Sequence, residues 1–128
     1  RRSQTEQEAT RLAVYSAIDV FRQVITELAQ FLQCDVIKDK TTVHEQLRDA
    51  TVAWSNDFAW PEDAQRSVEE QALAGLPFGG VLVLYRGSHM LGEGKRVEGA
   101  QWEDGGRARV ATSWNPQLEM QILVKAKA

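Results

Sequence analysis

Two groups of acidic side chains have spacings that could support chemistry. Glu45 and Asp49 lie four residues apart, which on a helix places two carboxylates on one face, as a metal site or an acid–base pair requires. Because Arg48 lies beside them and no second carboxylate pair has matching spacing, we interpret this face as solvated. Glu69 and Glu70, which we interpret as solvated in the same way, would point about 100° apart on a helix, so they cannot readily bind one ion together.

The other residues that enzymes use are isolated in the sequence. His44 and His89 are the only histidines, and no Cys-x-x-Cys or His-x-x-x-His spacing is present, so no metal site is predicted. Cys34 lies beside an acidic residue rather than a cation, which favours a packing role, and no serine has a Gly-x-Ser-x-Gly context. Gly92 to Lys95 leads into a predicted strand, not into a helix N-terminus that could bind phosphate. We therefore predict no catalytic residue and no cofactor, and we lean towards a protein that is not an enzyme.

Composition and charge exclude several classes of protein. The 128 residues include 15 Lys and Arg against 18 Asp and Glu, a formal net charge of −3, whereas nucleic-acid binders normally carry a basic excess. No run of eighteen apolar residues could span a bilayer, and a single cysteine cannot form an internal disulfide. We expect one soluble domain over residues 1–128 with neither nucleic acid nor membrane as a partner. Because Arg1 is not followed by a signal-peptide pattern, the predicted location is cytoplasmic.

The segment Gly87-Ser88-His89-Met90 resembles the remnant of a cleaved affinity tag, yet it lies about two thirds of the way along the chain. Three interpretations remain open: a natural loop, an engineered joint, or a permuted order in which the native chain starts near Leu91. Since tag remnants are excluded from functional reasoning, we assign no function to His89.

The elements that would position a site begin with a long amphipathic helix, from about Thr5 to Gln33. Its apolar residues recur at helical steps, namely Val14, Ile18, Phe21, Ile25, Leu28 and Leu32. The opposite stripe is polar, and the apolar stripe is wider than a coiled-coil seam. We therefore expect the helix to pack on a sheet, with a coiled-coil partner as the alternative.

Two shorter helices are expected next. Thr42 and Glu45 match a capping box, which predicts a helix that continues to about Asn56 and places Trp54 on its core face. Pro61 predicts the start of a third helix, because proline at a helix N-terminus loses no hydrogen bond. Gly75 is expected to end this helix in a left-handed conformation.

The second part of the chain predicts four strands. Val81–Tyr85 is short and apolar, as in a strand buried on both faces. Residues 95–102, 107–114 and 118–126 would then form a meander with turns at residues 103–106 and 115–117. The predicted class is α+β, in the order α-α-α-β-β-β-β, with three helices packed on one face of an antiparallel four-stranded sheet.

The strand pattern also predicts which residues share a face. Pairing Trp102 with Arg107 and Trp114 with Leu118 closes both hairpins in a consistent register. One face then collects Ala108, Val110, Thr112, Trp114, Leu118, Met120, Ile122 and Val124, and we expect the helices to cover it. The other face is polar at its edges and partly apolar in the middle, and we expect it to be uncovered.

The leading functional hypothesis is a non-enzymatic binding or assembly module that uses this uncovered face. Its predicted partner-binding residues are Trp102, Arg107, Arg109 and Leu123, because aromatic residues and arginine are enriched at interface centres. The partner would be another protein or a second copy of the chain, which makes a homodimer an expected state.

The alternative is a small-ligand or enzymatic pocket between the helix layer and the sheet. Gln101 and Thr112 would supply polar contacts on the core side, and Tyr15, Trp54 and Tyr85 would form walls around a small apolar ligand. A packed core and an open pocket differ in whether Gln101 and Thr112 line a void.

Overall fold

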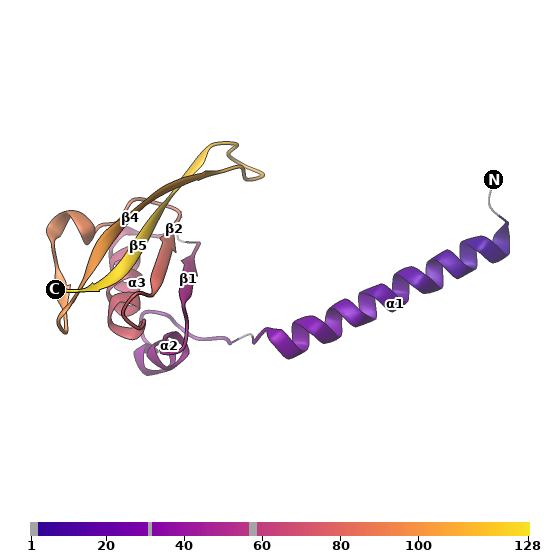
Figure 1. Cartoon of the computed structure of the whole chain (residues 1–128), viewed down its shortest axis with the longest axis horizontal. Coiled ribbons are helices and arrows are strands. Elements are labelled where there is room, and N and C mark those ends of the chain that lie inside the picture. Colours follow the sequence, from indigo (N-terminus) through magenta and orange to yellow (C-terminus); the bar gives the residue numbers. More distant parts are fainter. Residues whose placement is uncertain (1–2, 31, 57–58) are drawn as a thin grey trace. The chain divides into compact units, whose positions relative to one another are not determined.

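The computed structural model describes residues 3–30, 32–56 and 59–128 and shows a mixed α+β protein (Figure 1). The described elements are α1 (Gln4–Leu28), α2 (Lys40–Leu47), β1 (Val52–Ser55), α3 (Glu62–Gly75), β2 (Val81–Leu84), the 3₁₀ turn η1 (Leu91–Glu93), β3 (Arg96–Val97), β4 (Ala100–Val110) and β5 (Leu118–Lys127). By its contacts the chain divides into two compact units, residues 1–33 and residues 34–128. The first unit contains α1, and the second contains the other elements.

The long helix α1 forms as the periodicity predicts, although it ends at Leu28. Ser3 and Glu6 begin it with a capping box in which each side chain accepts a hydrogen bond from the other residue's backbone N–H. No residue of α1 is buried, and α1 contributes to neither hydrophobic core cluster. Both clusters are built within residues 34–128, and the packing of α1 on the sheet stays a prediction.

The second helix is shorter than predicted, and a strand follows it. Helix α2 begins after Asp39 and ends at Leu47, so the proposed capping box of Thr42 and Glu45 lies inside the helix. Val52–Ser55 is the strand β1, which pairs with β2 in parallel, so Trp54 lies on a strand. The prediction failed because its pattern of apolar steps is compatible with a helix, whereas the parallel partner of β1 is distant in sequence.

Helix α3 begins after Pro61 and ends at Gly75, close to the prediction. Gly75 is not left-handed, which corrects its expected role. A side chain there would lie 3.0 Å from Cδ1 of Leu47, so glycine allows α2 to pack closely on α3. Any larger residue at this position would have to displace Leu47 slightly.

The sheet has five strands in the order β1-β2-β5-β4-β3, with β1 parallel to β2 and the other pairs antiparallel. The predicted four-stranded antiparallel sheet is therefore only approximately right. Strand β2 lies inside the sheet and is largely buried, as predicted. Helix α3 connects the parallel strands β1 and β2, which is the ordinary crossover for a parallel pair.

The turns of the β3–β4–β5 meander differ from the prediction. The first hairpin turns at Glu98 and Gly99, whose φ angles are 50° and 77°, as a two-residue loop of this kind requires. Gly105 and Gly106 instead form a bulge within β4, where a side chain at Gly105 would lie 2.9 Å from Cγ2 of Ile122. Consequently Trp102 lies opposite Lys125, not opposite Arg107. Glycine serves both turns and bulges, so its presence did not distinguish them.

The face of the sheet that carries Leu123 is covered by α3. The main core cluster on this helix-covered face comprises Ala72, Leu73, Leu76, Leu82, Leu84, Met90, Ala100, Trp102 and Leu123. The second cluster, Val83, Leu118 and Met120 with Val81 and Tyr85 packed against it, contains no helical residue. The prediction paired the strand positions correctly near the β4–β5 turn, since Ala108 lies opposite Met120 and Val110 opposite Leu118. The prediction was wrong that helices cover the face with Leu118 and Met120, because within residues 34–128 α3 covers the face with Leu123.

Candidate functional site

A row of aromatic rings lies across the face of the sheet opposite α3. The ring centroids of Trp54 and Tyr85 are 6.0 Å apart in an edge-to-face arrangement, and those of Tyr85 and Trp114 are 6.4 Å apart. Such pairs stabilise each other by about 0.5–1.5 kcal/mol beyond simple burial. Trp54 and Trp114 nevertheless remain 56% and 57% exposed. The row is therefore ordered by its own contacts while much of its apolar surface stays in solvent.

The strands beside this row present apolar side chains on the same face. By register, the face carries Val52, Trp54, Val81, Val83, Ala108, Val110, Leu118, Met120, Ile122 and Val124, with Tyr85 following β2. We call these residues, together with Trp114, the open face, within which Val83, Leu118 and Met120 are buried as the second core cluster. Val52 is 54% exposed although it lies on a strand. Among the paired strand residues, Glu103 and Arg96 are the charged side chains on this side of the sheet. They lie near the start of β4, at the end of that strand away from Val110.

The residues predicted to bind a partner lie on the other face. Trp102 and Leu123 are 6% and 0% exposed within the main core, so the expectation that their face is uncovered is wrong. Arg107 and Arg109 share that face and are exposed, and Arg107 forms a 3.3 Å ion pair with Glu119. The charged residues lie near the β4–β5 turn and the apolar ones near α3, so the face is divided along its length.

The residues predicted to line a ligand pocket are dispersed, apart from one pair. Trp54 and Tyr85 are in contact within the aromatic row. Gln101 is half-buried near the start of β4, whereas Thr112 follows its end and closes a turn with Asn115 through hydrogen bonds of 2.9 Å. Tyr15 belongs to the separate unit that contains α1, where it is 57% exposed. Gln101 and Thr112 therefore do not line one cavity.

A groove does lie between the helices and the sheet, at α2, α3 and β1. Its volume is about 280 Å³, and its lining includes Leu47 of α2, Val68 and Ala72 of α3, and the two tryptophans Trp54 and Trp60. Its polar lining residues are Ser55, Asn56 and Gln71, and no charged residue is among the described side chains that line it. Of the predicted pocket residues, Trp54 alone belongs to this groove.

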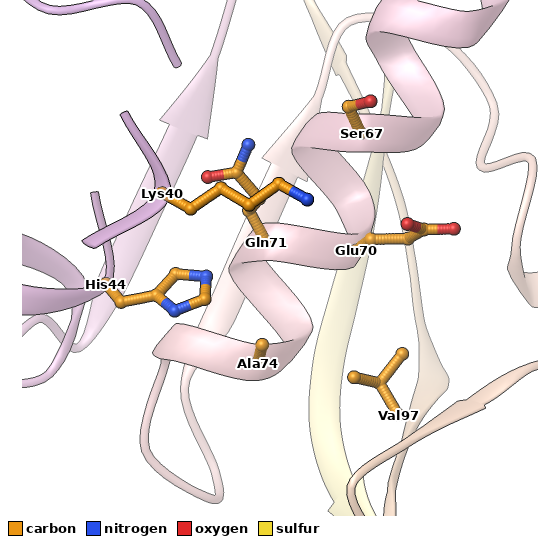
Figure 2. A pocket seen from close by; sticks show the side chains of 7 residues that line it. All are labelled: Lys40, His44, Ser67, Glu70, Gln71, Ala74 and Val97. Carbon is orange, nitrogen blue, oxygen red and sulfur yellow. The ribbon is translucent and has the colours of Figure 1, made fainter. Parts of the chain in front are cut away.

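A second, more polar cleft of about 160 Å³ lies between α2 and α3 (Figure 2). Figure 2 shows Lys40 and His44 projecting from α2, and Ser67, Glu70 and Gln71 from α3. Glu70 also forms an ion pair with Lys95. Nε2 of His44 and Oε1 of Gln71 are buried without a hydrogen-bond partner among the described residues.

A buried carboxylate holds the Gly-Ser-His-Met segment against α3. Glu69 is 1% exposed and accepts hydrogen bonds from the Ser88 hydroxyl and from the backbone N–H groups of His89 at 3.0 Å and Met90 at 3.3 Å. Met90 is 1% exposed in the main core. The interpretation of Glu69 as part of a solvated face is wrong, and residues 87–90 are integral to the packing whatever their origin.

Further along α3, polar side chains form a surface network around His89. Nε2 of His89 lies 2.5 Å from Oε1 of Gln65, and Arg66 forms ion pairs with Glu93 at 2.5 Å and Glu62 at 3.3 Å. The hydrogen bond from Arg66 to Glu93 contributes most to raising the pKa of the guanidinium above its usual value. These contacts support the loop after β2.

Other sequence interpretations concern single residues. Cys34 is exposed, which corrects its assignment as a packing residue. In the described part of the chain, no group of three or more His, Cys, Asp and Glu side chains could hold a metal ion. None of the described helices has the length and apolarity to cross a membrane.

Comparison with known proteins finds no matching family, no matching curated protein and no matching solved structure. The functional argument therefore rests on the residues and their geometry. Sequence reasoning missed the open face although its alternation was visible, because that alternation was assigned to the core. Gln71 and Trp60 carried no distinguishing signal, since a polar residue in a helix and a tryptophan before one are both ordinary.

Proposed function

We propose that this protein is a non-enzymatic binding and assembly module that uses the open face to associate with a second copy of itself. The single observation that supports this most is the aromatic row, in which Trp54 and Trp114 are more than half exposed above an apolar strand surface. Exposed apolar side chains gathered on one face are characteristic of protein interaction sites. Tryptophan and tyrosine also dominate the binding energy of interfaces.

Charge favours a second copy as the partner. A twofold symmetric dimer brings each residue of a patch close to the same patch on the partner. A charged patch would then place like charges together, whereas the aromatic row and the strand residues around it are uncharged. Two such faces can pack as sheets do in a β-sandwich, about 10 Å apart with their side chains interdigitated.

Sedimentation velocity over a wide range of protein concentration tests this proposal. We expect the wild-type chain to dimerise reversibly and Trp114→Ala to weaken association by about 2 kcal/mol or more, roughly thirtyfold in Kd. Trp60→Ala is the matched control, because Trp60 is a partly exposed tryptophan outside the open face and should leave association unchanged.

Two results would overturn the proposal. The first is a wild-type chain that stays monomeric at every concentration. The second is a dimer that responds equally to Trp114→Ala and Trp60→Ala, because its interface would then lie elsewhere. Melting curves of both variants verify that the fold is intact, so a loss of association is not confused with unfolding.

A further inference from the structure

The groove between α2, α3 and β1 combines an apolar floor with aromatic walls. Val68, Ala72 and Leu82 are buried at 8% exposure or less, whereas Trp54 and Trp60 are 56% and 39% exposed. Ligand sites typically pair a mainly apolar lining with a few placed polar groups. Tryptophan in the lining favours planar rings, which can stack on an indole or meet it edge to face. The absence of charged side chains among the described lining residues favours an uncharged ligand.

One buried amide provides the polar contact. Gln71 is 4% exposed, and its Nε2 donates a hydrogen bond to the backbone carbonyl of Val36. This bond sets the orientation of the amide and leaves Oε1 buried as an acceptor without a partner in the described structure. Val36 and Gln71 both line the groove, so we infer that the end of the Gln71 side chain lies at its wall. Buried acceptors are rarely left unpaired, so a donor from a bound molecule would complete this site.

We propose that this groove binds a small, uncharged, planar aromatic molecule that carries a hydrogen-bond donor. The donor pairs with Oε1 of Gln71, and the ring lies against the indole of Trp60. Ser55, which is 9% exposed, lies in the same lining and offers a hydroxyl that can donate or accept. The two contacts assigned here are separate from self-association, since neither Gln71 nor Trp60 belongs to the open face, although Trp54 lines the groove and belongs to that face.

The polar cleft on the other side of Gln71 defines the competing assignment. Gln71 also lines that cleft, together with Lys40, His44 and Glu70 (Figure 2). The cleft is smaller and carries charged groups, so it suits a small polar molecule rather than an aromatic ring. A ligand whose perturbations map to His44 and Lys40 would therefore contradict binding in the groove.

Indole and benzofuran form a matched pair of probes for this proposal. They have nearly the same bicyclic shape, but indole has an N–H donor where benzofuran has an oxygen acceptor. We expect indole to bind the full chain about tenfold more tightly than benzofuran, because only indole satisfies Oε1 of Gln71. Titrations followed by ¹⁵N–¹H correlation spectra should show the side-chain signals of Gln71 and Trp60 shifting together.

Two variants with matched controls assign the two contacts. Gln71→Met should abolish the preference for indole over benzofuran, whereas Gln46→Met, at an exposed position of α2, should retain it. Trp60→Leu should weaken both probes equally, whereas Trp114→Leu should affect neither. Trp54 is unsuitable because it belongs to both the groove and the aromatic row.

Several outcomes would overturn the proposal. These are equal affinity of the wild-type chain for the two probes, no binding of indole up to its solubility limit, and shifts confined to the polar cleft. If Gln71→Met does not fold, the comparison of probes on the wild-type chain and the Trp60→Leu titration still decide the matter. Self-association of the Trp114 variants is measured separately, so a failure of one site does not imply a failure of the other.

Discussion

The two faces of the sheet differ in what covers them rather than in how apolar they are. The helix-covered face carries Trp102 and Leu123, which α3 helps to bury almost completely, together with charged residues near the β4–β5 turn. The open face is apolar at nearly every paired position, yet Val52 and Trp54 are more than half exposed. A strand's alternation therefore identifies which residues share a face, but it does not identify which face a helix will occupy.

The helix-covered face tolerates charge where side chains can reach polar partners. Lys125 is 8% exposed on the same face as Leu123, and its Nζ donates a 2.6 Å hydrogen bond to the carbonyl of Leu76. This carbonyl lies just after α3 ends, where backbone acceptors lack partners within the helix. A lysine is thus compatible with the core because its stem packs among apolar groups while its ammonium group is satisfied.

The largest expected effect on stability belongs to the helix-covered face. Leu123→Ala should lower the free energy of unfolding by about 2–5 kcal/mol, because the side chain is fully buried and its removal leaves a cavity. Val52→Ala, on the open face, should change it by less than about 0.5 kcal/mol. Urea denaturation of both variants measures the difference. Equal losses would mean that the two faces are equally packed.

The next largest expected effect is a difference in stability loss between substitutions of two adjacent glutamates of α3. Glu69→Ala should destabilise the fold by about 3 kcal/mol, because it leaves the backbone donors of His89 and Met90 buried without an acceptor. Glu70→Ala removes only an exposed ion pair with Lys95 and should cost less than about 1 kcal/mol. Thermal or urea melts of the two variants test the contrast. Glu69→Gln, which retains one carbonyl acceptor, should recover part of the loss, and similar melts for both Ala variants would contradict a structural role for Glu69.

A smaller effect concerns the aromatic row within a single copy of the chain. At concentrations too low for association, Trp114→Ala should reduce stability by about 0.5–1.5 kcal/mol, the contribution of its ring contact with Tyr85. Chemical denaturation of the dilute protein measures this change. A loss as large as that of Leu123→Ala would show that Trp114 is a core residue and not part of an accessible surface.

The smallest predicted effect depends on pH. Burial lowers the pKa of Lys125, and this is offset in part by the charge of Glu98. Below the lowered pKa the ammonium is charged in both folded and unfolded states, so the full cost of burying the charge is present. As pH rises from that pKa towards the usual value of 10.5, the folded state loses its proton first, so stability should increase relative to a variant without the lysine.

Urea denaturation of the wild-type chain and Lys125→Met at a series of alkaline pH values tests this prediction. The difference in free energy of unfolding, wild type minus variant, should rise across the window between the lowered pKa and 10.5. A constant difference would mean that Lys125 titrates alike in the folded and unfolded chain.

Local patterns predicted the elements whose signals are local. Pro61 indicated α3, the continuous apolar run indicated β2, and the alternating apolar residues indicated β5. The same patterns could not indicate β1, because its hydrogen bonds go to a parallel strand on the far side of α3. The bulge at Gly105 was missed because its cause is a close approach to Ile122, which is also distant in sequence.

For the candidate sites too, local sequence signals were informative and contacts between distant segments were not predictable. Trp54 lines the groove at α2, α3 and β1, but its neighbours there, Trp60 and Gln71, come from other elements and had no signal of their own. Tryptophan content alone could not separate the buried Trp102 from the exposed Trp114, since both alternated with polar residues in plausible strands.

The sequence by itself determined the α+β class, the helix periodicity and the shared face of Ala108, Val110, Leu118 and Met120. The reason is that the spacing of residues along a helix or strand sets the direction in which their side chains point. Only the tertiary structure decided that α3 covers Leu123 and leaves Trp114 exposed, and that the Gly-Ser-His-Met segment is held by Glu69. These outcomes depend on contacts between distant segments, whose free energies arise from mutual burial and exist only once the segments meet.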